Sequence, residues 1–292
     1  MALPPLENLA PGKVGRAGGR RTATVDLEQA RAYAAATNDP NPAYAEGRYA
    51  PPVFGVVPTW DSLIAALDEL IPAELKPMLL HAEQDMHFHQ PLVPGMELTT
   101  EAASHSVRVA RSGTRLTIRG LSKDDEGRPV LEQFSTMFVR GMSGLEDAGD
   151  DRPDHSFPDE ARLRPVAEVL RTVDLDQTFR YRDASGDTNR IHVDEEFARS
   201  VKLPGIILHG LCTMAMCGSA VIDQVAGGDP ARLARLAVRF SRPVFPGNDL
   251  VVSLFDAGST GVNGRDGRAV YAFEAASGGK LVVRDGRAEV RN

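Results

Sequence analysis

The feature that most constrains this chain is an internal repeat. Residues Thr24–Asp39 align without gaps on Thr172–Asp187, and eight of the sixteen positions are identical. Further along, Phe88–Leu98 aligns on Phe240–Leu250. The two alignments have offsets of 148 and 152 residues, about half of the 292-residue chain. Internal similarity at a nearly constant offset indicates two copies of one structural unit, and we infer a tandem duplication.

A polar segment lies between the two copies. Gly141–Pro165 is rich in Asp, Gly and Pro and lacks apolar periodicity, which is typical of a solvated linker. We place the boundary near Asp150, so that residues 1–150 form the first repeat and residues 151–292 the second. A prior of roughly 150 residues per domain agrees with two units that each bury a core.

Each copy shows the same order of predicted elements. A short helix opens at Asp26 or Asp174 as N-cap, and after a polar loop a longer apolar helix covers Pro58–Leu70 or Leu211–Val225. Turn signals then separate segments with strand patterns. These predicted strands are Glu97–Val109, Thr114–Ser122, Val130–Arg140, Asp249–Ser259, Ala269–Ala276 and Leu281–Val290. One long helix followed by antiparallel strands predicts an α+β fold in which the sheet wraps the helix.

Charge and composition exclude several classes of function. The net charge is −7, from 33 Lys plus Arg against 40 Asp plus Glu, so no broad basic surface is expected for nucleic acid. No G-x-G-x-x-G or Walker loop suggests a nucleotide cofactor. The N-terminus lacks the pattern of a secretory signal, and polar residues interrupt the longest weakly charged run, Gly205–Ile222. The two cysteines share one apolar segment and are not placed to bridge, so we predict a cytoplasmic protein without a membrane partner.

Two neighbouring segments of the second copy carry a specific motif. Ser185-Gly-Asp-Thr-Asn-Arg-Ile-His192 is followed by Leu203-Pro-Gly-Ile-Ile-Leu-His-Gly210, which leads into the apolar helix. These segments resemble the MaoC-like, or (R)-specific (type 2), enoyl-CoA hydratases of the hotdog fold. The signature of that family runs Ser-Gly-Asp-x-Asn-Pro-(Leu/Ile)-His and then Pro-Ile-x-His-Gly. The duplication matches its double-hotdog members, although Arg190 stands where the family usually has Pro.

The resemblance implies a hydro-lyase that interconverts trans-2-enoyl and (R)-3-hydroxyacyl thioesters by syn addition or loss of water. In the family, the residues matching Asp187 and His192 hold the attacking water, and the backbone N–H matching Gly210 binds the enolate oxygen. Asn189 would brace the loop or the dyad, and His209 is expected to pack or to bond the backbone rather than to carry a proton. Neither a metal nor another cofactor is required.

The first copy lacks most of this motif. Asp39 stands at the position equivalent to Asp187, but Tyr44 replaces the histidine and Pro58 replaces the glycine. Proline has no N–H to donate. We therefore predict one active site per chain, with a degenerate first repeat that accommodates the acyl tail.

The expected partner is an acyl-CoA or acyl carrier protein thioester. Arg239 and Arg242 are candidates for binding the phosphates of the carrier, although scattered solvated arginines would look the same in sequence. The two hotdog units are expected to pair within the chain, and a further homodimer is possible. Two alternatives stay open: a hotdog acyl-CoA thioesterase and a non-catalytic acyl-thioester-binding subunit.

Overall fold

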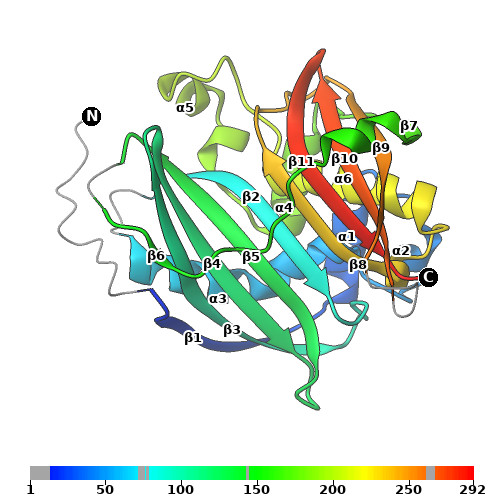
Figure 1. The fold of residues 1–292 in the computed structure, drawn as a ribbon, viewed down its shortest axis with the longest axis horizontal. Helices are drawn as coiled ribbons and strands as arrows, with labels where there is room; N and C mark the ends of the chain where they lie inside the picture. The colour runs from blue at the N-terminus through cyan, green and yellow to red at the C-terminus, as the bar shows by residue number, and fades with distance from the viewer. Residues whose placement is uncertain (1–13, 72–75, 77–78, 143–144, 261–266) are drawn as a thin grey trace. The chain divides into compact units, whose positions relative to one another are not determined.

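The computed structural model of the protein describes residues 14–71, 76, 79–142, 145–260 and 267–292. It divides into two compact units (Figure 1). Unit 1 comprises Met1–Thr24, Pro58–His89 and Glu97–Asp154, and unit 2 comprises Val25–Val57, Gln90–Met96 and His155–Asn292. Both units combine helix with antiparallel sheet, which confirms the predicted α+β class. None of the described helices is long and apolar enough to cross a membrane.

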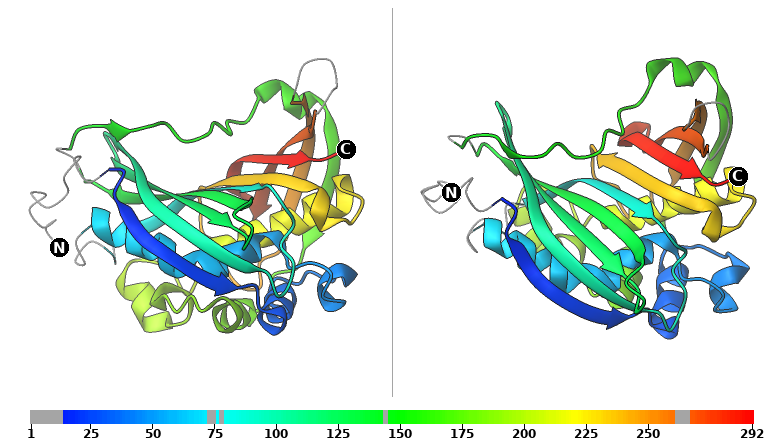
Figure 2. Two further views of the ribbon diagram at one scale, coloured as in Figure 1. Left: turned by 90° about the horizontal axis from the view of Figure 1, so that it is seen from below. Right: turned by 60° about the horizontal axis from the view of Figure 1, so that its bottom comes forward.

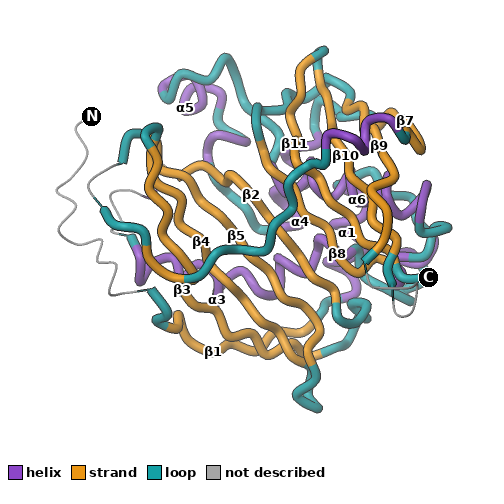
Figure 3. Tube along the Cα trace, viewed as in Figure 1, coloured by secondary structure: helices purple, strands orange, loops and turns teal. Residues whose placement is uncertain are grey.

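Unit 1 is a five-stranded antiparallel sheet on one long helix (Figures 2 and 3). The strand order is β1 (Ala17–Thr24), β3 (Glu97–Ala110), β4 (Gly113–Lys123), β5 (Pro129–Arg140) and β2 (Leu79–Phe88), with the short β6 (Ala148–Gly149) paired to β3. Helix α3 (Val56–Leu70) buries Leu63 and Leu67 against Leu116 and Ile118 of β4. The apolar spacing of the helix therefore meets the inward face of the sheet.

Unit 2 repeats this arrangement. Its strands lie in the order β8 (Leu233–Phe240), β11 (Lys280–Val290), β10 (Ala269–Ser277), β9 (Leu250–Ser259) and β7 (Pro165–Arg171). Helix α6 (Gly210–Val225) is buried at every position from Leu211 to Ile222. It contacts β7, β8 and β9, so the sheet wraps a buried helix, as its largely apolar sequence predicts.

The shorter helices of both repeats lie in unit 2. Helix α1 (Leu27–Ala36) packs against α4 (Gln177–Ser185), with the shorter helices α2 (Pro42–Ala45) and α5 (Glu195–Ser200) nearby in sequence. Tyr33 and Tyr181 occupy equivalent positions of the two repeats, and their buried hydroxyls lie 3.2 Å apart. A contact between equivalent residues is expected where two copies of one segment pack about a local two-fold axis.

One predicted helix cap is correct and the other is wrong. Asp26 accepts a hydrogen bond from the backbone N–H of Gln29 at 2.7 Å and caps α1. Asp174 does not cap α4, which begins three residues later at Gln177. Its carboxylate pairs instead with Arg180 and accepts from the Asn38 amide, because those two donors reach it from α4 and from the first repeat.

The segment predicted to be an irregular linker, Gly141–Pro165, contains two short elements. β6 pairs with β3, and a 3-10 helix covers Asp159–Leu163. Hydrogen bonds from Arg108 to the carbonyls of Ala148 and Gly149 reinforce the β6 pairing. The sequence lacks apolar periodicity here because each element is too short to show a period.

Candidate active site

The predicted motif forms a tight loop after α4. Gly186 ends the helix in the left-handed conformation, with φ of 78°, and its N–H bonds the carbonyl of Arg182. This conformation favours glycine because a side chain would be strained. Asp187 follows, and its carboxylate accepts from the N–H of Asn189 at 3.1 Å. Asn189 in turn accepts from the N–H of Ile191 at 3.3 Å and caps a 3-10 helix, Arg190–His192.

His192 lies at the end of that 3-10 helix and is 7% exposed. Its Nδ1 lies 2.8 Å from the carbonyl oxygen of Ile207. Because a carbonyl oxygen only accepts hydrogen bonds, Nδ1 carries the proton and Nε2 keeps its lone pair. Burial lowers the pKa of His192 below its ordinary value, and this outweighs the opposite effects of the Ile207 carbonyl and Asp187. The ring is therefore neutral at pH 7 and presents Nε2 as a base.

The structure brings Asp187 and His192 together with His209. One carboxylate or imidazole atom from each of the three residues lies within 4.8 Å of the others. The rings of His192 and His209 stack, with centroids 3.8 Å apart and planes inclined by 26°. The predicted pair thus shares one cluster with His209, which was expected to pack or to bond the backbone rather than to carry a proton.

Gly210 is the first residue of α6, and His209 precedes it as the N-cap. An N–H at this position has no partner within the helix and lies at its positive end. A Cβ added at Gly210 would lie 3.4 Å from the ring of Phe240 in β8. Gly210 therefore offers a backbone donor at the end of α6, close to a wall formed by Phe240.

Thr178 is a site residue that the motif does not reveal. Its hydroxyl lies 3.0 Å from the carbonyl oxygen of His192 and 3.1 Å from Nδ1 of His209. A signal exists in the repeat alignment, because the first copy has Ala30 at the equivalent position. A buried polar residue in only one copy marks a function that the other copy lacks.

Asp187, His192 and His209 are also the described residues that come closest to a metal site. Nε2 of His209 lies 3.1 Å from the backbone oxygen of Asp187, and its Nδ1 lies 3.1 Å from the Thr178 hydroxyl. Only one carboxylate and one imidazole nitrogen then remain as ligands. Catalytic zinc sites use three protein ligands, so the arrangement suits proton handling better than a metal.

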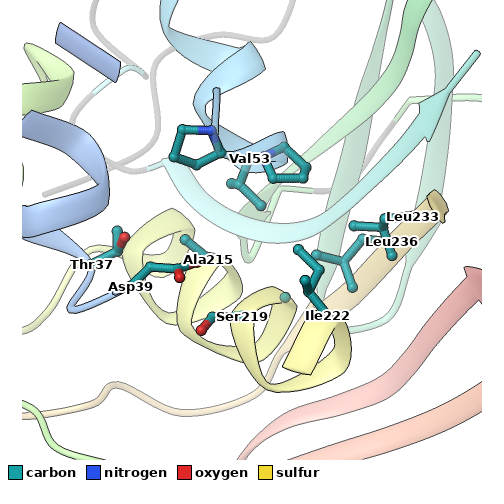
Figure 4. A pocket seen from close by; sticks show the side chains of 11 residues that line it. Thr37, Asp39, Val53, Ala215, Ser219, Ile222, Leu233 and Leu236 are labelled. Carbon is teal, nitrogen blue, oxygen red and sulfur yellow. The ribbon is translucent and has the colours of Figure 1, made fainter. Parts of the chain in front are cut away.

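The equivalent positions of the first repeat lie in a different setting. Burial raises the pKa of Asp39 to about 6, and its carboxylate accepts from the N–H of Asn41. Tyr44 is 2% exposed, and no described residue bonds its hydroxyl. Pro58 lies in the first turn of α3. A small pocket in unit 2 is lined by the polar residues Thr37, Asp39 and Ser219 and by apolar residues such as Val53 (Figure 4).

The two predicted carrier-binding arginines lie at the end of β8. Arg239 is half exposed and reaches Asp285 at 3.4 Å, and Arg242 donates to the carbonyl of Leu281 at 3.2 Å. They flank Phe240, whose ring faces the Gly210 position. Arg190 stands where the family motif has proline. Its guanidinium group pairs with Asp194 and lies over the ring of Phe197, so the Asp194 carboxylate balances its charge.

Comparison with known proteins links each half of the chain to a family. Residues 158–274 match the MaoC like domain, and residues 13–133 match the FAS1-like dehydratase domain region. The 3-hydroxyacyl-thioester dehydratase Y of Mycobacterium tuberculosis is 34% identical over 220 residues, which are 72% of this chain and 72% of the relative. The chain belongs to the MaoC-like dehydratase family.

Other members and structures agree with this assignment. The probable enoyl-CoA hydratase 2 of Dictyostelium discoideum is 27% identical and covers 77% of this MaoC-like chain and 79% of its own length. A MaoC-like dehydratase structure from Phytophthora capsici has a TM-score of 0.81 at 27% identity, covering 94% and 96% of the two chains. A Mycobacterium tuberculosis structure described as a double hotdog fold has a TM-score of 0.62 at 13% identity, covering 98% and 97%. The predicted family and double-hotdog fold are confirmed.

Proposed function

We propose that this MaoC-like chain is a hydro-lyase that interconverts a trans-2-enoyl thioester and an (R)-3-hydroxyacyl thioester by syn addition or loss of water. The observation that carries the proposal is the meeting of the Asp187 carboxylate with the His192 ring. The names of the relatives from Mycobacterium and Dictyostelium support the same reaction in its two directions.

The dyad supplies the two proton transfers that the reaction needs. A water molecule between the Asp187 carboxylate and Nε2 of His192 loses a proton to the dyad as its oxygen bonds to C3 of the enoyl group. The dyad then delivers a proton to C2 on the same face of the former double bond.

The backbone N–H of Gly210 stabilises the charge that develops between these two transfers. As water adds to C3, an electron pair moves to the thioester oxygen and forms an enolate. A fixed N–H at the start of α6 meets that oxygen with no reorganisation. Protonation of C2 returns the electron pair and restores the thioester carbonyl.

Ultraviolet absorbance of the conjugated enoyl group provides the test. The purified chain is mixed with crotonyl-CoA and with a longer trans-2-enoyl-CoA, and the product is resolved on a chiral column. Loss of the enoyl chromophore with (R)-3-hydroxyacyl-CoA and no free thiol is the expected result. Release of free CoA thiol would identify a thioesterase, and no change with either substrate would favour a non-catalytic acyl-binding subunit.

The first repeat has a different role in this proposal. Its equivalent positions carry Tyr44 and Pro58 instead of a histidine and a glycine, so the residues 1–150 provide space for the acyl tail and no second site. The chain-length preference measured with the two enoyl substrates tests this role.

Three finer predictions complete the proposal. Arg239 and Arg242 bind the phosphates of CoA or of a carrier protein, since both guanidinium groups are exposed beside Phe240. The protein is cytoplasmic, and it forms a homodimer. Sedimentation of the purified chain tests the dimer, and the KM values of alanine variants for CoA substrates test the arginines.

A further inference from the structure

We propose that His209 is a positioning residue that aligns Asp187 and His192 for proton transfer. The inference rests on the proposed hydratase function and deepens it. His209 is 1% exposed and stacks on His192 with ring centroids 3.8 Å apart. It thus touches one member of the dyad through its face and the other through its edge.

The hydrogen bonds of His209 define its tautomer. Nε2 lies 3.1 Å from the backbone oxygen of Asp187, and a carbonyl oxygen only accepts, so Nε2 carries the proton. Nδ1 is then an acceptor and takes the hydroxyl proton of Thr178 at 3.1 Å. Burial lowers the pKa of His209 well below its ordinary value, which keeps this ring neutral.

Through these contacts, the His209 side chain restrains both Asp187 and His192. The bond to the Asp187 carbonyl restrains the loop that starts at Gly186, and the stacked ring sets the plane of His192. The single hydroxyl proton of Thr178 is donated to Nδ1 of His209, so the approach of that hydroxyl to the His192 carbonyl at 3.0 Å is a packing contact and not a second hydrogen bond. Tyr181 also packs against His209, with ring centroids 4.8 Å apart, and restrains the imidazole further.

His209 has no free nitrogen with which to move a substrate proton. Both ring nitrogens are engaged within the protein, whereas no described residue bonds Nε2 of His192. The geometry therefore separates the two histidines by role. His192 exchanges the proton, and His209 keeps the atoms between which it moves at the right distance.

Two substitutions separate the ring stacking of His209 from its hydrogen bonds. His209→Gln keeps a side-chain N–H that reaches the Asp187 carbonyl and loses the stacked ring. His209→Phe keeps a ring and loses both hydrogen bonds. His155→Phe is the matched control, because His155 is 2% exposed and its Nδ1 bonds the backbone oxygen of Asp285 at 2.7 Å, outside the dyad.

The expected result is a fall of about 10- to 100-fold in kcat for His209→Phe, since small misplacements of reacting groups cost factors of this size. KM stays within about threefold and His209→Gln recovers much of the loss, because the Asp187 contact is restored. His155→Phe lowers the thermal midpoint without lowering kcat. A His209→Phe enzyme with normal kcat, or one whose kcat falls only as much as that of the control, would overturn the proposal.

Proton NMR separates this inference from the hydratase assignment, because it needs no turnover. The Nδ1 proton of His192 is followed by its solvent exchange in the free protein. His209→Gln removes the stacked ring and should speed that exchange about tenfold, and His155→Phe should leave it unchanged. An inactive wild-type enzyme with this pattern would reject the reaction alone, and an unchanged exchange rate in His209→Gln would reject the positioning role.

Discussion

Replacing Gly210 by proline removes one hydrogen-bond donor and tests the role of the helix terminus. Proline is well tolerated at the first position of a helix, where the N–H has no intrahelical partner. His209, the residue before it, has φ of −59° and ψ of 136°, the extended conformation that precedes proline without a clash. The first repeat already carries Pro58 at the equivalent position, in the first turn of α3.

The size of the effect follows from what the substitution changes. Loss of a single oxyanion donor costs about 2.7 to 4 kcal/mol in the transition state, or about 10²- to 10³-fold in kcat. The free energy of unfolding should change by less than about 1 kcal/mol, since no helical hydrogen bond is lost. Gly210→Ala is the control: it keeps the N–H, and its Cβ would lie 3.4 Å from the Phe240 ring.

The assay is hydration of crotonyl-CoA by absorbance, with urea unfolding of the same samples. We expect the kcat of Gly210→Ala to stay within a few-fold of the wild-type value. The kcat of Gly210→Pro should fall by about 10²- to 10³-fold, while its free energy of unfolding stays nearly unchanged. A proline variant with nearly full activity would show that this N–H does not bind the oxyanion. Equal losses in both variants would instead trace the effect to crowding at Phe240.

The remaining predictions concern the dyad and its first-repeat counterparts. His192→Ala should abolish hydration while Tyr44→Phe leaves most of it, in the same absorbance assay; the reverse pattern would contradict a single active site. Tyr44→Phe should leave the unfolding free energy unchanged or raise it by up to about 1 kcal/mol in urea, because no described residue bonds the buried hydroxyl; a clear loss would reveal a partner. Burial lowers the pKa of His192, so kcat/KM should decrease with acidification only below pH 6.5. A decrease that begins at a higher pH would show that another group controls it. The pKa of Asp39 rises to about 6 in the folded protein from about 3.9 unfolded. The folded state then binds the proton more tightly, so this stabilisation is present at pH 4 and is lost as pH rises through 6; Asp39→Asn should flatten the urea midpoint over that range, and an unchanged pH dependence would exclude Asp39 as its source.

Several elements were predictable because their patterns are long. The apolar run that became α6 and the strands β3, β4, β5, β9, β10 and β11 match their predicted bounds within a few residues. Strands β1, β2, β7 and β8 were not predicted. β1 and β7 are edge strands with mostly exposed side chains, and neither shows a clear alternation of apolar and polar residues.

The site was predictable where the motif is local in the sequence. Asp187, Asn189 and His192 lie within six residues, and the loop geometry that joins them follows from Gly186 and two short side-chain caps. Thr178 escaped notice because it lies in a different element from the motif. The role proposed here for His209 also required the structure, because the motif contains this histidine but does not show its contacts with Asp187 and His192.

The sequence by itself determined the duplication, the double-hotdog family and the identity of the residues available for proton transfer, because these depend on residue type and spacing along the chain. Only the tertiary structure decided which ring nitrogen of each histidine carries the proton. That choice depends on the backbone carbonyls of Asp187 and Ile207, which lie 22 and 15 residues from their imidazole partners. Every residue has such a carbonyl, so its position can distinguish the two histidines only after the chain has folded.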